Sequence, residues 1–143
     1  MGRYRRGSHT VYELHYHFVF TTKYRKRVLR GDVGVRLREL VREVCQARDI
    51  QVLKGHVRPE YVHLFASLPP HLAPAEAMRA IKGKSARKLL REFPRLKKQL
   101  WGGHLWSRGY FVCTSGNVTD EVVTQYVMNQ DLTSDDEDFK VSE

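Results

Sequence analysis

Tyr61 and His63 are the first residues whose types and spacing suit chemistry. They lie two apart in the segment 58–70, which carries prolines near both ends. On a strand, residues two apart project from the same face, so a phenol and an imidazole would look into one cleft. The apolar residues that alternate with them would pack against helices on the other face: Val62, Leu64 and Ala66. Because histidine titrates, packs and ligates equally readily, the pattern leaves a ligand site and an ordinary hydrogen-bonded histidine both open.

Two further pairs of side chains share a face by their spacing. His15 and His17 alternate within the aromatic and β-branched segment 11–21, whose composition favours a strand. Such a pair can bind a metal ion, but a place on the solvent or sheet face of a strand explains it too. Tyr126 and Gln130 lie four apart in a helical pattern, so they are neighbours on one helical face.

Two segments concentrate positive charge. In the run 22–27, Tyr24 stands among cations that include Lys23 and Arg25, which suits a nucleic-acid backbone with a base stacked alongside. An exposed charged turn is the alternative. Further along, cations cluster beside small residues of a predicted helix: Lys82, Lys84, Arg87 and Lys88. This second cluster favours a phosphate-contacting face, with a solvated helix face as the alternative.

The whole-chain composition points to a polyanionic partner. The 143 residues suit one domain, and 25 Lys and Arg against 16 Asp and Glu give a formal net charge of +9. A protein that is simply basic remains the alternative. Cys45 and Cys113 have no paired spacing, which indicates reduced core residues. Because no run of about eighteen apolar residues occurs, we expect a cytoplasmic protein that neither spans a membrane nor is secreted.

Periodicity and turn signals predict an alternation of strands and helices. The expected strands cover 11–21, 50–57, 61–68 and 108–114, and the expected helices cover 32–48, 74–93 and 119–130. The second and third strands form an antiparallel hairpin, and 94–100 is a linker. This order predicts an α+β fold, a ferredoxin-like sandwich whose antiparallel sheet has helices on one face and a C-terminal tyrosine-bearing helix. We expect a catalytic domain at 11–130, between a basic flexible arm at 1–10 and an acidic disordered tail at 131–143.

Five runs of the sequence, in order and at these spacings, carry a family resemblance. They are KYRKRVL at 23–29, PEYVHLFASLPP at 59–70, AIKGKSARKLL at 80–90, LWSRGYFVCT at 105–114 and VVTQYVMNQ at 122–130. Together they resemble the HUH-type, single-tyrosine transposases of small bacterial insertion sequences, a single-strand DNA transposase family. The resemblance spans about residues 10–130.

The resemblance implies a nuclease and strand transferase that acts on single-stranded DNA at hairpin-bearing element ends. It assigns Tyr126 as the nucleophile that forms a 5′-phosphotyrosine link, and His63 and Gln130 as ligands of a divalent ion, Mg²⁺ or Mn²⁺. A phenol suits such a reversible transfer because the bond energy is conserved for rejoining, and a metal ion polarises the phosphoryl oxygens. The residues expected to contact DNA are the aromatic Tyr24 and the basic Lys23, Arg25, Lys82, Lys84 and Arg87.

The resemblance also implies a homodimer with composite active sites, in which the tyrosine helix can complete the partner subunit's site. The segment 115–117, Ser-Gly-Asn, is expected to be flexible and would permit such a swing. The expected location is the bacterial cytoplasm, at the nucleoid when the protein is bound to DNA.

The sequence departs from the family pattern at Tyr61, which stands at the position of the first histidine. A neutral phenol is a poor metal ligand, and binding as phenolate would need a strongly depressed pKa. Three alternatives follow. The ion is held by His63, Gln130, water and DNA phosphate alone; a nearby residue such as His56 substitutes; or the chain is a catalytically weakened copy that acts as a single-stranded or hairpin DNA-binding protein.

Overall fold

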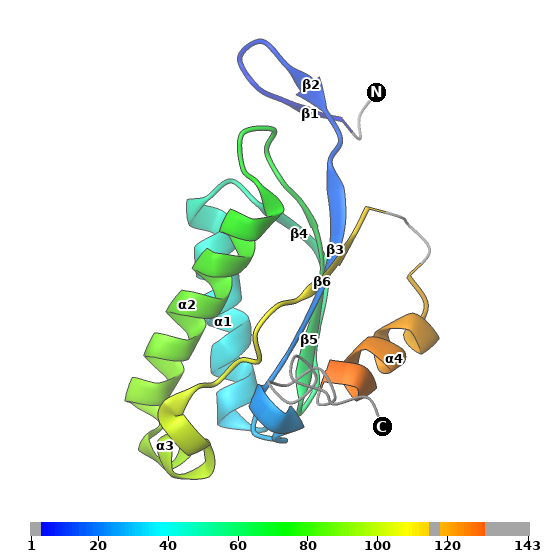
Figure 1. The fold of residues 1–143 in the computed structure, drawn as a ribbon. Helices are drawn as coiled ribbons and strands as arrows, with labels where there is room; N and C mark the ends of the chain where they lie inside the picture. The colour runs from blue at the N-terminus through cyan, green and yellow to red at the C-terminus, as the bar shows by residue number, and fades with distance from the viewer. Residues whose placement is uncertain (1–3, 115–117, 131–143) are drawn as a thin grey trace.

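A four-stranded antiparallel sheet stands between helices on both of its faces (Figure 1). The computed structural model describes residues 4–114 and 118–130, and for Trp101, Asp120 and Gln130 it describes the backbone alone. The strands lie in the order β4 (Gln51–Val57), β5 (Tyr61–Ser67), β3 (His15–Thr21) and β6 (Phe111–Cys113). The predicted α+β class with an antiparallel sheet is therefore confirmed.

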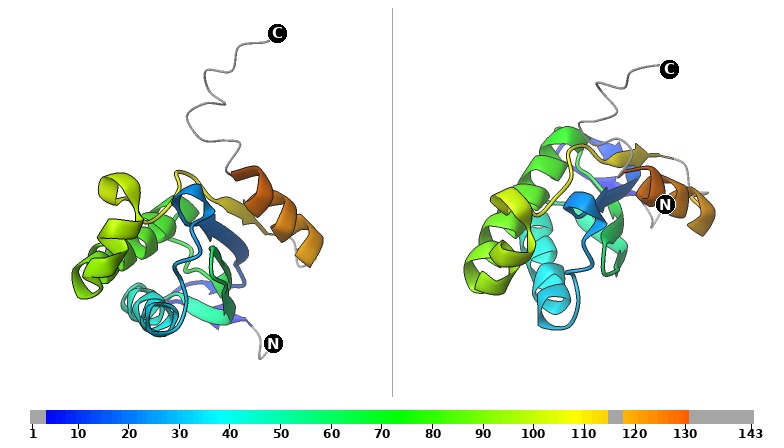
Figure 2. Two further views of the ribbon diagram at one scale, coloured as in Figure 1. Left: turned by 90° about the horizontal axis from the view of Figure 1, so that it is seen from below. Right: turned by 60° about the horizontal axis from the view of Figure 1, so that its bottom comes forward.

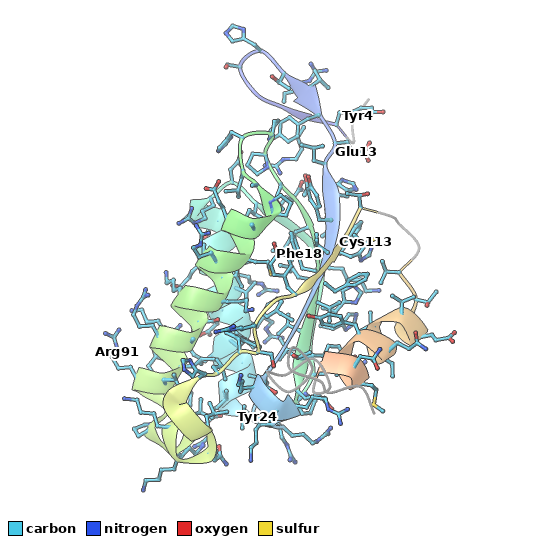
Figure 3. The ribbon with its side chains drawn as sticks, viewed as in Figure 1. Tyr4, Glu13, Phe18, Tyr24, Arg91 and Cys113 are labelled. Atoms are coloured by element: carbon cyan, nitrogen blue, oxygen red, sulfur yellow. The ribbon has the colours of Figure 1, made fainter. Side chains whose placement is uncertain are left out.

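Helices α1 (Asp32–Ala47) and α2 (Pro74–Glu92) cover one face of this sheet and enclose the main core with it. Val62, Leu64 and Ala66 of β5 project into this core and are at most 2% exposed. Phe18 of β3, with no exposed surface, lies on the same side (Figure 3). Fully burying one such large side chain stabilises the fold by about 1.5–3 kcal/mol. The alternation of β5 thus leaves Tyr61 and His63 for the opposite face.

Helix α4 (Asp120–Gln130) lies across the sheet from α1 and α2, as the view from below shows (Figure 2). It packs through Val123 and Val127 against Val19 of β3, in a small cluster separate from the main core. The helix begins as predicted, because the backbone N–H of Val122 donates to the Thr119 hydroxyl at 3.3 Å.

The N-terminal segment forms a second, two-stranded sheet. Strand β1 (Arg5–Arg6) pairs antiparallel with β2 (Val11–Tyr12), so the strand expected over 11–21 is divided into β2 and β3. The Arg5 guanidinium donates to the Ser67 carbonyl and to an Asp49 carboxylate oxygen, both at 2.9 Å. These contacts tie part of the expected flexible arm to the domain. Residues 1–3 and the expected acidic tail at 131–143 lie outside the described residues.

Several connections differ from the sequence prediction. The expected linker at 94–100 contains a short helix, α3 (Pro94–Gln99), because a proline is tolerated in the first turn. A 3₁₀ turn, η2 (Trp101–Gly103), follows it. Strand β6 is shorter than expected, and in the loop before it the carbonyls of Ser107 and Gly109 accept hydrogen bonds from Lys82 of α2. Among the described residues, no helix is both long and apolar enough to cross a membrane.

Candidate active site

The sheet face beneath α4 gathers the rings that the sequence singled out. In the antiparallel register, His63 of β5 lies opposite Val19 of β3 and opposite His56 of β4, while Tyr61 lies opposite Thr21. Directly opposed residues of an antiparallel pair share a face. Tyr61, His63 and His56 therefore belong to the same side of the sheet, and the contact of α4 with Val19 falls beside His63.

His17 and His63 are diagonal neighbours across the β3–β5 pair, and their rings meet. The Nδ1 atom of His17 lies 3.0 Å from Nε2 of His63, and their ring centroids are 5.3 Å apart. A hydrogen bond of this length requires that one ring carries the proton and the other accepts it. His15 and His17 share one face of β3 as predicted, since both rings contact Phe65. His15 also lies 3.8 Å from the Glu13 carboxylate. Sequence reasoning missed the His17–His63 contact, and only the register of β3 against β5 reveals it.

The His17 ring is held firmly in place. It stacks on Phe65 with ring centroids 4.2 Å apart and is 7% exposed. Burial lowers the pKa of His17, so the neutral imidazole is favoured. Its second nitrogen, Nε2, is buried and has no hydrogen-bond partner among the described residues. This position therefore presents a neutral, fixed imidazole to His63.

Tyr126 is placed by the docking of α4. Its ring packs against the Val19 cluster and lies 5.8 Å from the Phe111 ring, and Tyr61 packs partly buried against the same cluster. Burial raises the pKa of Tyr126 to about 12. The phenol is thus protonated near neutral pH, and an attack by its oxygen requires that the proton be removed as the new bond forms.

Gln130 is the predicted neighbour of Tyr126 on α4, and the structure describes only its backbone. Gln130 is the last residue of α4, and its side chain lies outside the described part of the chain, as do residues 115–117. Within the described part, no group of three or more histidine, cysteine or acidic side chains is arranged to hold a metal ion. Two imidazoles neighbour His63, those of His17 on β3 and of His56 on the edge strand β4.

The turn that follows β3 reaches the same helix. Lys23, Tyr24 and Arg25 form the 3₁₀ turn η1, in which Tyr24 is 52% exposed and lies below the Lys23 ammonium. The Arg25 guanidinium donates to the Met128 sulfur of α4 at 3.1 Å. Figure 3 shows Tyr24 at the end of β3 away from Glu13. An exposed ring among cations thus lies beside the C-terminal end of α4.

The second predicted DNA-contacting cluster lies on the other side of the sheet. The Lys82 ammonium donates to the carbonyls of Ser107 and Gly109 at 2.9 and 2.8 Å, and burial lowers its pKa to about 8. Lys84 pairs with the Glu43 carboxylate at 3.3 Å. Arg87 is exposed and lines a groove between α1 and α2 together with Arg48, Arg79 and Lys84. The structure therefore does not bring these three residues together with Tyr126.

Comparisons with known proteins agree on one family. The family model described as "Transposase IS200 like" matches residues 10–130. The chain is 35% identical to the ISDra2 transposase TnpA of Deinococcus radiodurans over 126 residues, which cover 88% of this chain and 90% of that protein. It is 28% identical to the transposase for insertion sequence element IS200 of Salmonella typhimurium, over 91% of this chain and 85% of that protein.

Solved structures show the same likeness. The crystal structure of a candidate transposase from Deinococcus radiodurans R1 matches with a TM-score of 0.82 and 36% identity, over 88% of this chain and 97% of that chain. A REP-associated tyrosine transposase bound to a REP hairpin matches with a TM-score of 0.54 and 17% identity, over 85% and 68% of the two chains. At that identity the second match concerns the fold alone.

Proposed function

The chain belongs to the IS200-like family of transposases, and from this premise we propose that it cuts and rejoins single-stranded DNA through Tyr126. The observation that carries the proposal is the docking of α4. Through Val123 and Val127, this helix lies on Val19, the residue directly opposite His63, and so holds the half-buried Tyr126 over the histidine-bearing face.

The proposed reaction is a transesterification. The Tyr126 oxygen attacks a backbone phosphorus, a phosphorus–tyrosine oxygen bond forms, and the bond from phosphorus to the 3′ oxygen breaks. The phenol proton passes to water as the new bond forms, and the departing 3′ oxygen takes up a proton from water and becomes a free hydroxyl. Attack by a 3′ hydroxyl on the phosphotyrosine reverses these steps and rejoins the strand. The protein needs no external energy source, because one phosphodiester bond replaces another.

A divalent ion fits the donors of this face only partly. His63 would hold it, together with the Gln130 side chain that the resemblance assigns, and the ion would polarise the phosphoryl oxygens. Neutral nitrogen and amide donors suit Mn²⁺ better than Mg²⁺, which prefers oxygen and water. Tyr61 adds a phenol where an imidazole is expected. Water and DNA phosphate oxygens would fill the remaining coordination positions of the ion.

We propose single-stranded DNA with hairpins as the substrate. The net charge of +9 favours a polyanion, and the fold neighbour is a transposase bound to a REP hairpin. Because released counterions drive such binding, affinity for a labelled hairpin should fall steeply as salt rises. Replacing Arg25 or Arg87 with alanine should reduce that dependence. Affinity that stays constant over a tenfold range of salt would contradict the electrostatic basis.

The covalent adduct is the decisive test of the nucleophile. DNA labelled on the 3′ side of the cleavage site should migrate with the wild-type protein on a denaturing gel, and Tyr126→Phe should abolish this band while hairpin binding persists. Tyr61→Phe is the matched control, since it also removes one phenol oxygen, but from β5 rather than from α4. An adduct that persists in Tyr126→Phe but disappears in Tyr61→Phe would move the nucleophile to Tyr61.

A composite site in a homodimer is part of the proposal. Helix α4 packs on the sheet through a small cluster separate from the main core, and contacts of this extent would let the helix serve a partner subunit. Mixing Tyr126→Phe with His63→Ala should then restore cleavage at about a quarter of the sites, because half of randomly paired dimers are mixed and each carries one intact site. No activity in the mixture would show that each subunit uses its own tyrosine.

The substitution at Tyr61 supports one alternative function. A chain that lost a metal ligand could retain hairpin binding without cleavage. A native gel and a denaturing gel of the same samples distinguish the two functions, because a binding-only protein shifts the hairpin under native conditions and leaves no adduct under denaturing conditions in either Mg²⁺ or Mn²⁺.

A further inference from the structure

We propose that His17 supplies the second imidazole of the divalent-metal site in this chain, in partnership with His63. The inference rests on the proposed function in one respect, that a divalent ion is the cofactor. It differs from the pattern of the family resemblance, in which both histidines come from β5. Here the second imidazole comes from the neighbouring strand, β3.

The first support is the placement of the two rings. His17 stands two residues before Val19, and Val19 lies directly opposite His63, so His17 and His63 are diagonal neighbours on one face. Tyr61 lies on that face too, but a neutral phenol binds divalent ions poorly. The β3–β5 register therefore offers an imidazole beside His63 without any change in the backbone.

The second support is the separation of the ring nitrogens. Nδ1 of His17 and Nε2 of His63 are 3.0 Å apart. Two neighbouring ligands of an octahedral ion, each about 2.1 Å from it, lie about 3.0 Å from each other. The two nitrogens thus already have the separation that shared coordination requires, and the ion would replace the hydrogen bond between them.

His56 is the competing candidate. It lies directly opposite His63 in β4 and shares its face, but it is exposed on the edge strand. His17, by contrast, is buried and stacked on Phe65. A ligand whose orientation is fixed by packing loses less conformational freedom when it binds. The packing therefore favours His17 over His56.

The test is metal binding without DNA, with Mn²⁺ as the probe. Calorimetry gives the affinity, and pulsed electron paramagnetic resonance gives the number of imidazole nitrogens bound to Mn²⁺. Wild type should show two coordinated nitrogens. His17→Phe, which keeps a ring stacked on Phe65, should show one nitrogen and bind at least about tenfold more weakly. His56→Ala should match wild type, and Tyr61→His should add a nitrogen and tighten binding.

Unchanged affinity and an unchanged nitrogen count in His17→Phe would overturn the inference, and so would a loss of one nitrogen in His56→Ala. Weaker binding with both nitrogens retained would also overturn it, and would make His17 a positioning residue for His63. If His17→Phe does not fold, His17→Asn gives the same comparison. Adduct formation by wild type is scored separately, so a failed metal prediction with an intact adduct rejects only this inference, whereas an absent adduct rejects the proposed function.

Discussion

Removing two methyl groups from Val127 should loosen α4 without unfolding the domain. Val127 is 5% exposed and packs with Val123 and Val19, the other buried members of its cluster. Val127→Ala loses two buried carbon groups at about 0.8 kcal/mol each and leaves a small cavity, for a total of about 2 kcal/mol. Because this cluster is separate from the main core, the loss should fall on the docking of α4 rather than on the sheet.

Native-state hydrogen exchange measures the effect directly. A cost of about 2 kcal/mol corresponds to an increase of about 30-fold in the population of the undocked helix. The amides of α4 should then exchange about 30-fold faster, while those of β3 and β5 keep their rates. Val122→Ala is the matched control, since Val122 is 40% exposed on the same helix. Equal acceleration in α4 and in the sheet would refute the reasoning, because it would mean that α4 opens only with the whole domain.

Three further substitutions test the scaffold by urea unfolding. Trp106→Phe removes the buried indole hydrogen bond to the Ser85 hydroxyl, 3.0 Å long, and should cost about 1–2 kcal/mol, with a smaller cost in a Ser85→Ala background. Gly34→Ala should destabilise α1 by about 1 kcal/mol despite alanine's better helix propensity, because the added Cβ would lie 3.0 Å from the Leu29 carbonyl oxygen; a gain in stability would contradict this. Lys82 has a folded pKa of about 8, below its ordinary 10.5, so between these values the unfolded chain holds more protons. The unfolding free energy of wild type should therefore rise with pH across that window relative to Lys82→Met, and parallel curves would show that burial of Lys82 is not the cause.

Local patterns in the sequence predicted the fold and the two faces of β5, because periodicity and turn residues act within one element. The alternation of Val62 and Leu64 with Tyr61 and His63 is of this kind. The contact of His17 with His63, two residues that are 46 apart in the chain, depends on the register between β3 and β5, which no local pattern specifies. The family resemblance supplied roles for Tyr126 and His63, but it could not show which residue stands beside His63 where the pattern is broken.

The cations near Lys82 show a second limit. Their clustering was visible in the sequence, yet the partners that hold Lys82 are two carbonyls of a loop 25 and 27 residues away. Charge composition therefore indicated a polyanionic partner for the chain, while the use of each cation depended on tertiary packing. The sequence pattern does not predict α3, because a proline after a helical pattern indicates the end of one helix and is equally compatible with the first turn of another.

The separation of cations onto two faces has a consequence for how a DNA molecule would pass over this protein. Lys23 and Arg25 lie at the α4 side, whereas Arg87 lies in the groove between α1 and α2. A single strand that reached both sets would have to bend round an edge of the sheet, with the nucleotides at the bend turned toward solvent. We predict that hydroxyl-radical footprinting of one bound strand would give two protected tracts divided by a cleaved gap. One unbroken tract would mean that the DNA stays on one face.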